Sequence, residues 1–351
     1  MLSSVALLKP ERSVLEPRYL KHWLNSPVAY SSMTGEMTGT AIKRLVLKQI
    51  RATSIQLAPL PEQKRIADKL DSVLARVDAC RDHLDRLPAL LKRFRQSILA
   101  AATSGALTED WRYTSDTGEW RNTDIQSVAK VGTGSTPLRS QANFYAESGI
   151  PWVTSAATSK SLVTNPEQFV TNEAIVAHRL KIYPVGTLLV AMYGEGKTRG
   201  QITELGIPAT INQACAAVVV DQTLALKAFV KFALQANYLE MRELAEGGNQ
   251  PDLNLSKIKE FPLALPPLPE QTEIVRRVEI LFAFADRLEA RLATARRQVG
   301  QLTPALLAKA FRGELVAQDP ADEPAAELLK RLAAQREAAP KIKRSRKIAN
   351  P

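Results

Sequence analysis

The segment Leu57-Ala58-Pro59-Leu60-Pro61-Glu62-Gln63 returns later in the chain as Leu265-Pro266-Pro267-Leu268-Pro269-Glu270-Gln271. The two copies belong to a longer repeat, because residues 57–108 align without a gap with residues 265–316. A proline in the first helical turn costs no hydrogen bond, and the glutamate after it favours the positive helix start. Each copy is therefore predicted to begin a helix, and a unit used twice constrains the architecture of the whole chain.

Apolar residues continue through both copies at alternating spacings of four and three positions. In the first copy they are Ile66, Leu70, Val73, Val77, Cys80, Leu84, Leu87, Leu91, Phe94 and Ile98. In the second copy they are Ile274, Val278, Leu281, Ala285, Leu288, Leu292, Ala295, Val299, Leu302 and Leu306. A seven-residue repeat places a narrow apolar stripe on one side of a helix, and such a stripe is buried only against another helix.

We therefore expect the two copies to pair as a coiled coil that acts as a spacer. About 40 helical residues make a rod of about 60 Å. The alternative is a pair of ordinary core helices in a globular domain. Pro88 and Pro304 stand inside the two helices, so a kink or a short break is expected in each.

Composition bounds the class of protein. With 351 residues, the chain has room for two or three domains. It has no apolar run of 18 residues and no signal peptide at its start, so we expect a cytoplasmic protein with no membrane partner. The only cysteines, Cys80 and Cys215, have no metal-ligand neighbours, and Cys80 falls on a predicted coiled-coil core position.

The net charge of +11 suggests an acidic partner, but its distribution is uneven. Residues 120–264 are almost neutral, whereas residues 341–347 are dense in lysine and arginine. This tail either contacts nucleic acid or is a solvated, disordered end. Bulk charge alone indicates nucleic-acid binding only weakly.

Residues 109–264 are predicted to form a mixed domain of the α+β class. The helical period stops after Gly105, and short β-rich runs such as 188–192 and 216–220 alternate with Gly and Pro loops. A helix from about residue 225 to 245 follows. Residues 317–351 are expected to form a short helix and the basic tail.

The first 56 residues repeat the final third of that domain. Tyr19-Leu20-Lys21-His22-Trp23-Leu24 aligns with Phe229-Val230-Lys231-Phe232-Ala233-Leu234. We therefore expect residues 1–56 to be the C-terminal remnant of a first domain, with the part equivalent to about residues 111–210 absent. The order is then domain remnant, spacer helix, complete domain, spacer helix.

An ordered set of motifs gives this chain a resemblance to a known family. The recognition domains of that family open with the loop found here as Gly134-Ser135-Thr136-Pro137. They continue with Ile150-Pro151-Trp152, the glycine loop 194–200 and Asn212-Gln213, and the Pro-Pro-Leu-Pro-Glu-Gln helix start closes the domain. The chain resembles the specificity (S) subunits of type I restriction-modification systems, truncated at the N-terminus.

The resemblance implies a fold and a function. The fold is two target-recognition domains joined to a long antiparallel two-helix coiled coil. The function is non-catalytic recognition of double-stranded DNA, which positions methyltransferase (M) subunits and, through them, the restriction (R) subunit. S-adenosylmethionine, ATP and magnesium are then expected on the partner subunits only, with no cofactor on this chain.

Candidate DNA-binding residues lie in and around the glycine loop. Glycine lets the backbone approach a phosphate, while lysine, threonine and arginine offer donors to phosphates or base edges. The candidates are Lys197, Thr198, Arg199, Gln201, Gln213, Arg139 and Lys160. In the alternative interpretation, both glycine-containing loops are turns that only hold the domain together.

Other function classes fit the sequence less well. Residues 191–198 match a relaxed phosphate-binding pattern, but two glycines and a proline follow where a P-loop needs a helix. Glu195-Gly196-Lys197 resembles a nuclease core but lacks an upstream aspartate. The histidines have no metal spacing, so we expect no catalytic or metal site. A protein–protein scaffold that has lost specific DNA binding is the alternative from another class.

Overall fold

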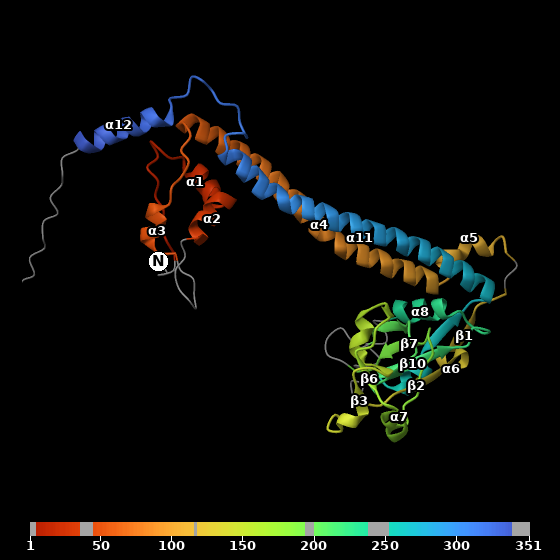
Figure 1. The fold of residues 1–351 in the computed structure, drawn as a ribbon. Coiled ribbons are helices and arrows are strands. Elements are labelled where there is room, and N and C mark those ends of the chain that lie inside the picture. The colour runs from red at the N-terminus through yellow and green to blue at the C-terminus, as the bar shows by residue number, and fades with distance from the viewer. Residues whose placement is uncertain (1–4, 36–44, 116–117, 194–199, 238–252, 339–351) are drawn as a thin grey trace, which may run out of the picture. The chain divides into compact units, whose positions relative to one another are not determined.

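The computed structural model describes residues 5–35, 45–115, 118–193, 200–237 and 253–338 (Figure 1). The chain divides into two compact units. The first unit comprises Met1–Pro88 and Ala290–Pro351, and the second unit comprises Ala89–Glu289. Two long helices contribute residues to both units.

These long helices are the two copies of the repeat. Helix α4 (Leu60–Thr103) and helix α11 (Leu268–Phe311) contain 44 residues each. Pro88 and Pro304 lie inside them, and each helix continues past its proline, so the short break predicted from these prolines does not occur. A single proline removes one backbone hydrogen bond, and the turns on either side sustain the helix.

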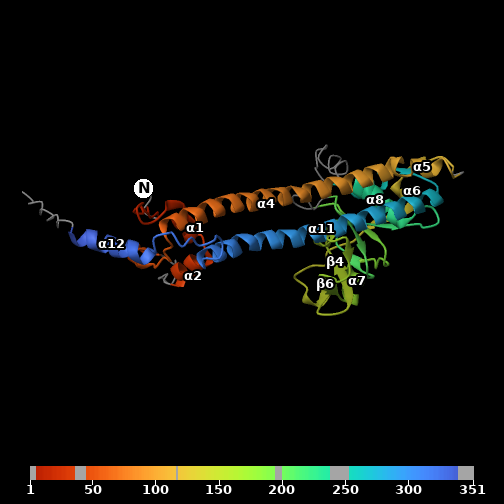
Figure 2. The same ribbon diagram turned by 90° about the horizontal axis from the view of Figure 1, so that it is seen from above.

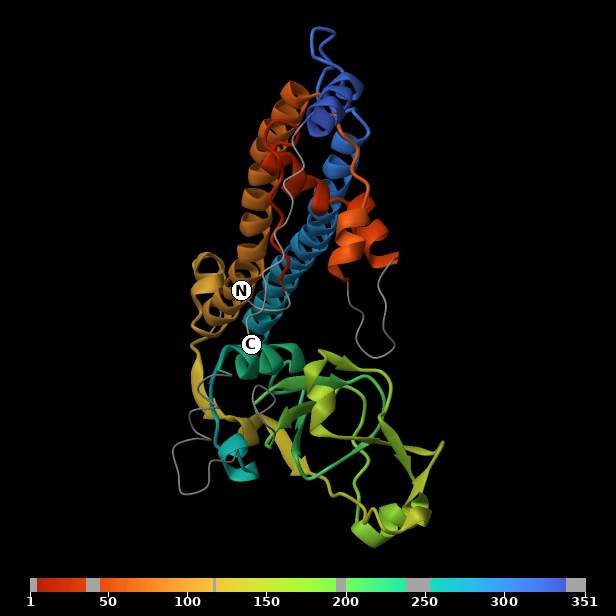
Figure 3. The same ribbon diagram turned by 90° about the vertical axis from the view of Figure 1, so that its left-hand side faces the viewer.

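Within each unit, α4 and α11 lie side by side and run antiparallel (Figures 2 and 3). In the first unit, Arg296 pairs with Asp85 at 2.7 Å, while Ile66 and Leu307 share one core cluster. In the second unit, Arg95 pairs with Asp286 at 2.5 Å. The antiparallel coiled coil predicted from the heptads is confirmed, and the alternative of ordinary core helices is wrong.

The heptad stripe is buried unevenly along the two helices. Ile66 and Leu70 near one end, and Ile274 and Val278 near the other, are almost fully buried. Cys80 is exposed, so its assignment to the coiled-coil core is wrong. A helix with a single neighbour leaves the flanks of its stripe in contact with water, and only positions that also face a packed domain lose all exposure.

The described residues of the second unit form three sheets. The first is five-stranded and has the order β2 (Ala129–Thr133), β10 (Cys215–Val220), β7 (Leu188–Ala191), β8 (Ile202–Leu205), β5 (Leu162–Val163). The second is four-stranded and has the order β3 (Tyr145–Ala146), β6 (Gln168–Val170), β4 (Ile150–Val153), β9 (Thr210–Ile211). In the third, β1 (Arg121–Asp124) pairs antiparallel with β11 (Pro262–Leu265).

The main core of the second unit lies around helix α8 (Lys227–Ala236). Five of its residues are buried, and α8 lies between the five-stranded sheet and the ends of α4 and α11 (Figure 1). Phe232 of α8 meets Phe282 of α11 edge to face, with ring centroids 5.9 Å apart. Among its described residues, this unit also contains the α-helices α5 (Glu109–Arg112), α6 (Ile125–Val128), α7 (Asn172–His178) and α10 (Leu255–Lys259).

The first unit contains four further helices among its described residues, and the first two of them pack on the ends of α4 and α11. These are α1 (Pro17–Leu24), α2 (Pro27–Gly35), α3 (Leu47–Ala52) and α12 (Ala325–Ala338). Tyr19 and Trp23 of α1 are buried, and Tyr19 meets Phe311 at a centroid distance of 5.2 Å. Helix α1 thus occupies the place on the repeat that α8 occupies in the second unit, as the alignment of the two segments predicts.

Candidate nucleic-acid interface

The loop Gly134-Ser135-Thr136-Pro137 leaves strand β2 and runs close to strand β9. A Cβ atom at Gly134 would lie 1.6 Å from the backbone oxygen of Ile211, which no side chain can occupy. The N–H of Ser135 donates to the same oxygen at 3.1 Å. Glycine is therefore required here by the close approach of two backbones.

Side chains from three neighbouring segments fix this loop. The indole Nε1 of Trp152 donates to the Ser135 carbonyl at 3.2 Å. The Tyr145 hydroxyl donates to the Pro137 carbonyl at 2.7 Å, and the Thr136 hydroxyl donates to Oε1 of Gln213 at 2.5 Å. Gln213 therefore holds the loop, which agrees with the structural interpretation of this candidate. Its amide nitrogen remains a potential donor.

Arg139 lies just beyond the loop, and two aromatic rings support it. Its guanidinium carbon is 5.1 Å from the ring centroid of Tyr145 and 5.7 Å from that of Trp152. Stacking of this kind orients the planar guanidinium while leaving its N–H groups free to donate. Arg139 and Gln213 are far apart in the sequence, but in the structure both lie next to the loop at residues 134–137.

Two further candidates, Gln201 and Lys160, lie around the 3-10 helix η3 (Ser155–Ser159). Thr158 of this helix is buried, and its hydroxyl oxygen lies 3.5 Å from Oε1 of Gln201. Lys160 follows directly as the C-cap residue and is exposed. The remaining candidates, Lys197, Thr198 and Arg199, lie outside the described residues.

The described elements on either side of residues 194–199, which lie outside the described residues, do not support the phosphate-binding interpretation. Strand β7 ends at Ala191 and pairs antiparallel with β8, so the two strands form a hairpin. Gly200 donates its N–H to the Ala191 carbonyl at 2.8 Å, which closes that hairpin. A P-loop needs a helix after its strand, and here a strand of the same sheet follows.

Two chemistry-bearing side chains of the second unit, Cys215 and Glu204, are buried or paired within the protein. Burial raises the pKa of the Cys215 thiol to about 12, so this cysteine is a poor nucleophile. Burial would raise the pKa of Glu204, but hydrogen bonds from Lys227 and Lys231 lower it, and they tie α8 to β8. The described residues form no group of three or more potential metal ligands. They also include no helix that is both long and apolar enough to span a membrane.

Glu270 has a role that sequence reasoning missed. Its side chain is fully buried and accepts hydrogen bonds from Thr108 at 2.7 Å, Arg112 at 2.5 Å and Trp120 at 2.9 Å. These donors precede strand β1, so Glu270 ties the start of the sheet domain to the start of α11. The available signal was the exact repetition of glutamate in both copies, which we interpreted only as a favourable helix start.

Gln271 and its equivalent, Gln63, make the same contacts in the two units. Oε1 of Gln271 accepts from the N–H of Leu226, the N-cap residue of α8, at 2.7 Å. Oε1 of Gln63 accepts from the N–H of Glu16, the N-cap residue of α1, at 2.9 Å. Each glutamine therefore connects a spacer helix to the start of the helix that packs on it.

Comparison with known proteins finds consistent matches along the chain. A family model described as the type I restriction modification DNA specificity domain matches residues 4–87 and 117–295. The specificity subunit of the type I restriction enzyme StySPI from Salmonella potsdam is 30% identical, and the alignment covers 97% of this chain and 76% of that protein. The EcoKI specificity subunit from Escherichia coli K12 is also 30% identical, with coverage of 97% and 76%.

Solved structures show the same fold. A chain from a solved type I R-M system has a TM-score of 0.72 at 22% identity, with 88% of this chain and 74% of that chain covered. The HsdS subunit from Thermoanaerobacter tengcongensis has a TM-score of 0.60 at 20% identity, with coverage of 88% and 73%.

Proposed function

Because the chain belongs to the family of type I restriction-modification DNA specificity domains, we propose that it is a non-catalytic subunit that reads a specific double-stranded DNA sequence. The observation that carries this proposal is the extent of the match. It covers the sheet domain of the second unit and large parts of both spacer helices, rather than one motif. Relatives aligned over nearly the whole chain are specificity subunits.

The structure of the second unit supports a separation of roles between a domain that reads DNA and helices that position the partner subunits. Base-edge contacts specify a DNA sequence, whereas other contacts only position the protein. A domain that reads bases must therefore be held rigidly on whatever it positions. Glu270 and Gln271 provide that attachment through partly buried hydrogen bonds. Glu270 binds Arg112 and Trp120 before strand β1, and Gln271 binds the backbone of Leu226 at the start of α8.

The partners in this proposal are methyltransferase subunits, with a restriction subunit joining through the complex. Exposed apolar side chains on α11 support protein docking there, since Ile280 and Phe284 are 54% and 45% exposed one helical turn apart. Bound S-adenosylmethionine, ATP and magnesium then belong to the partners, and the complex acts in the cytoplasm.

Selection from a randomised DNA pool tests the proposal. The full chain, mixed with its methyltransferase subunit, is incubated with the pool, and retained DNA is sequenced. We expect one sequence to be enriched over several rounds. If the methyltransferase subunit binds the chain and no sequence is enriched, the DNA-reading role fails and the scaffold alternative is the better account.

A further inference from the structure

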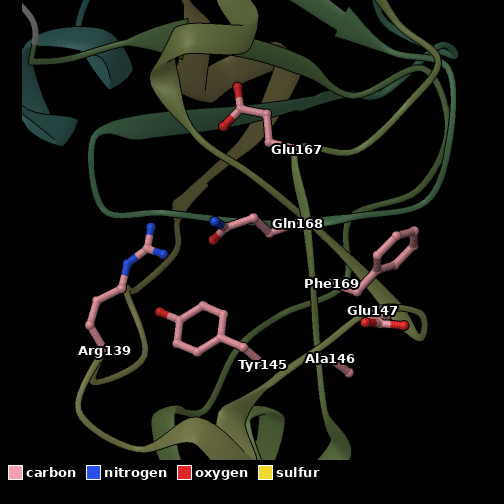
Figure 4. A pocket seen from close by; sticks show the side chains of 7 residues that line it. All are labelled: Arg139, Tyr145, Ala146, Glu147, Glu167, Gln168 and Phe169. Atoms are coloured by element: carbon pink, nitrogen blue, oxygen red, sulfur yellow. The ribbon is translucent and has the colours of Figure 1, made fainter.

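A pocket of about 340 Å³ with both polar and apolar walls opens beside the loop at residues 134–137 of the second unit (Figure 4). Strand β6 contributes Gln168 and Phe169, and the segment around β3 contributes Tyr145, Ala146 and Glu147. Arg139 and Glu167 complete the lining. Figure 4 shows the Arg139 guanidinium, the Gln168 amide and the Glu167 carboxylate along one side of the view.

Arg139 offers donors that the protein does not use. Its guanidinium is supported by the rings of Tyr145 and Trp152, and among the described residues no carbonyl or carboxylate accepts a hydrogen bond from it. A stacked arginine has lost much of its side-chain freedom before any ligand arrives. Binding therefore orders less of the side chain, and the planar fork keeps its geometry.

The same pocket offers acceptors. Oε2 of Glu167 accepts from the Thr154 hydroxyl at 2.5 Å, which orients the carboxylate, and no described residue donates to its other oxygen. Oε1 of Gln168 is buried without a hydrogen-bond partner among the described residues. Because that oxygen has almost no accessible surface, the exposed carboxylate of Glu167 is the acceptor that a ligand can reach.

The charges in the pocket favour a neutral ligand over an anion. The lining contains one guanidinium, that of Arg139, and two carboxylates, those of Glu147 and Glu167, so as a whole it is not cationic. A phosphate would meet repulsion from both carboxylates. The edge of a base pair carries acceptors and donors without net charge, and it matches a lining that mixes both.

We propose that this pocket reads the major-groove edge of one G·C base pair, an inference that rests on the proposed function. Guanine presents O6 and N7 as acceptors for the fork of an arginine, and cytosine presents its N4 amino group to a carboxylate. Arg139 donates to the guanine, and Glu167 accepts from the paired cytosine. Arg139 is thus a specificity-determining residue, and Tyr145 and Trp152 are positioning residues.

The test compares the DNA sequences that the wild type and three variants select from a randomised pool, with the full chain and its methyltransferase subunit. Arg139→Lys keeps the charge and removes the fork, Arg139→Ala removes both, and Glu167→Ala removes the acceptor. We expect all three to lose the preference at the same G·C position, by about 5- to 150-fold for the arginine variants. All other positions of the selected sequence should be unchanged.

Arg121→Ala is the matched control, because Arg121 is an exposed arginine of the same unit that does not line the pocket. Thermal melting of each variant confirms folding. A wild-type preference that survives in both Arg139 variants overturns the pocket assignment and leaves the proposed function standing. A different result would identify a phosphate contact instead. Arg139→Ala would then bind all sequences more weakly by the same factor, with the slope of affinity against salt reduced by about one charge, and Arg139→Lys would restore the affinity. No enrichment by the wild type overturns the proposed function together with this inference.

Discussion

Glu270 and Glu62 occupy equivalent positions of the repeat but have different surroundings. Three side chains donate to buried Glu270, whereas no described side chain donates to Glu62. Removing a carboxylate from a buried, hydrogen-bonded pair costs about 3–5 kcal/mol, because its partners are left unpaired. We predict that Glu270→Ala lowers the free energy of unfolding by this amount and that Glu62→Ala, the matched control, lowers it much less. Urea unfolding measures both values, and equal losses would contradict the assigned role of Glu270.

Gly134 and Gly300 give opposite predictions for the same substitution. A Cβ at position 134 collides with the Ile211 backbone, whereas a Cβ at position 300 meets nothing within 4 Å. Gly134→Ala should displace the loop at residues 134–137 and weaken the selection of a specific DNA sequence. Gly300→Ala should stabilise helix α11 by about 0.5–1 kcal/mol, since alanine loses less backbone entropy. Thermal melting and DNA selection on both variants test this pair, and a stable, fully selective Gly134→Ala variant would refute it.

Glu273 makes the second unit sensitive to acid. Hydrogen bonding by Arg276 lowers the pKa of Glu273 to about 2, and Arg277 adds to the shift against the opposing effect of burial. An unfolded glutamate has a pKa of about 4.3, so this stabilisation is present above that pH and is lost as the pH falls toward 2. Between pH 5 and pH 2, the free energy of unfolding should fall less for Glu273→Gln than for the wild type. The difference between the two decreases should be on the order of 1–3 kcal/mol. Identical pH profiles of the unfolding free energy would count against the ion pair.

At the scale of elements, Pro88 and Pro304 interrupt the backbone hydrogen bonding of the two long helices. Each removes a backbone hydrogen bond, and Pro88 is exposed, so it contributes little packing in return. Pro88→Ala should therefore stabilise the coiled coil by about 1–3 kcal/mol. The midpoint of thermal unfolding, followed by circular dichroism at the helical band, measures the gain. A fall in the midpoint would show that the proline has a packing role that its exposure does not reveal.

The elements that the sequence predicted well are those with a local signal. Seven-residue spacing from Ile66 to Ile98 is sufficient to identify a coiled-coil helix, and the β-rich runs at 188–192 and 216–220 are strands β7 and β10. The order of strands in the sheets was not predictable, because the pairing of β1 with β11 joins segments at opposite ends of the domain. Such pairings depend on side-chain packing that no local pattern encodes.

The candidate site was predictable only in part, for the same reason. The loop motif around Gly134 and the candidate Arg139 were visible in the sequence, and the structure brings Gln213 to them. Glu167 and Gln168 carried no signal, since a polar pair before a short strand is common. Their importance comes from facing Arg139 across a pocket, and that relation exists only in the folded domain.

At the scale of the whole molecule, the sheet domain and the adjoining parts of α4 and α11 form one compact unit. In the proposed function, the sheet domain determines which DNA sequence is bound, and the helices hold the partner subunits at a fixed distance from that sequence. The predicted domain boundaries, 1–56, 57–108, 109–264, 265–316 and 317–351, stay predictions. Exchange of residues 109–264 keeps Glu270 and Gln271 but replaces their partners Arg112, Trp120 and Leu226, so the donor domain must supply equivalent donors.

In the proposed function, residues 109–264 read the DNA sequence. The most direct measurement replaces this segment with the corresponding domain of a relative whose target differs, while Glu270 and Gln271 stay in place. The wild type and the chimera, each with the methyltransferase subunit, then select from the same randomised DNA pool. We predict that the enriched half-site changes to that of the donor domain. A chimera that folds, binds the methyltransferase subunit and still enriches the original half-site would contradict the account.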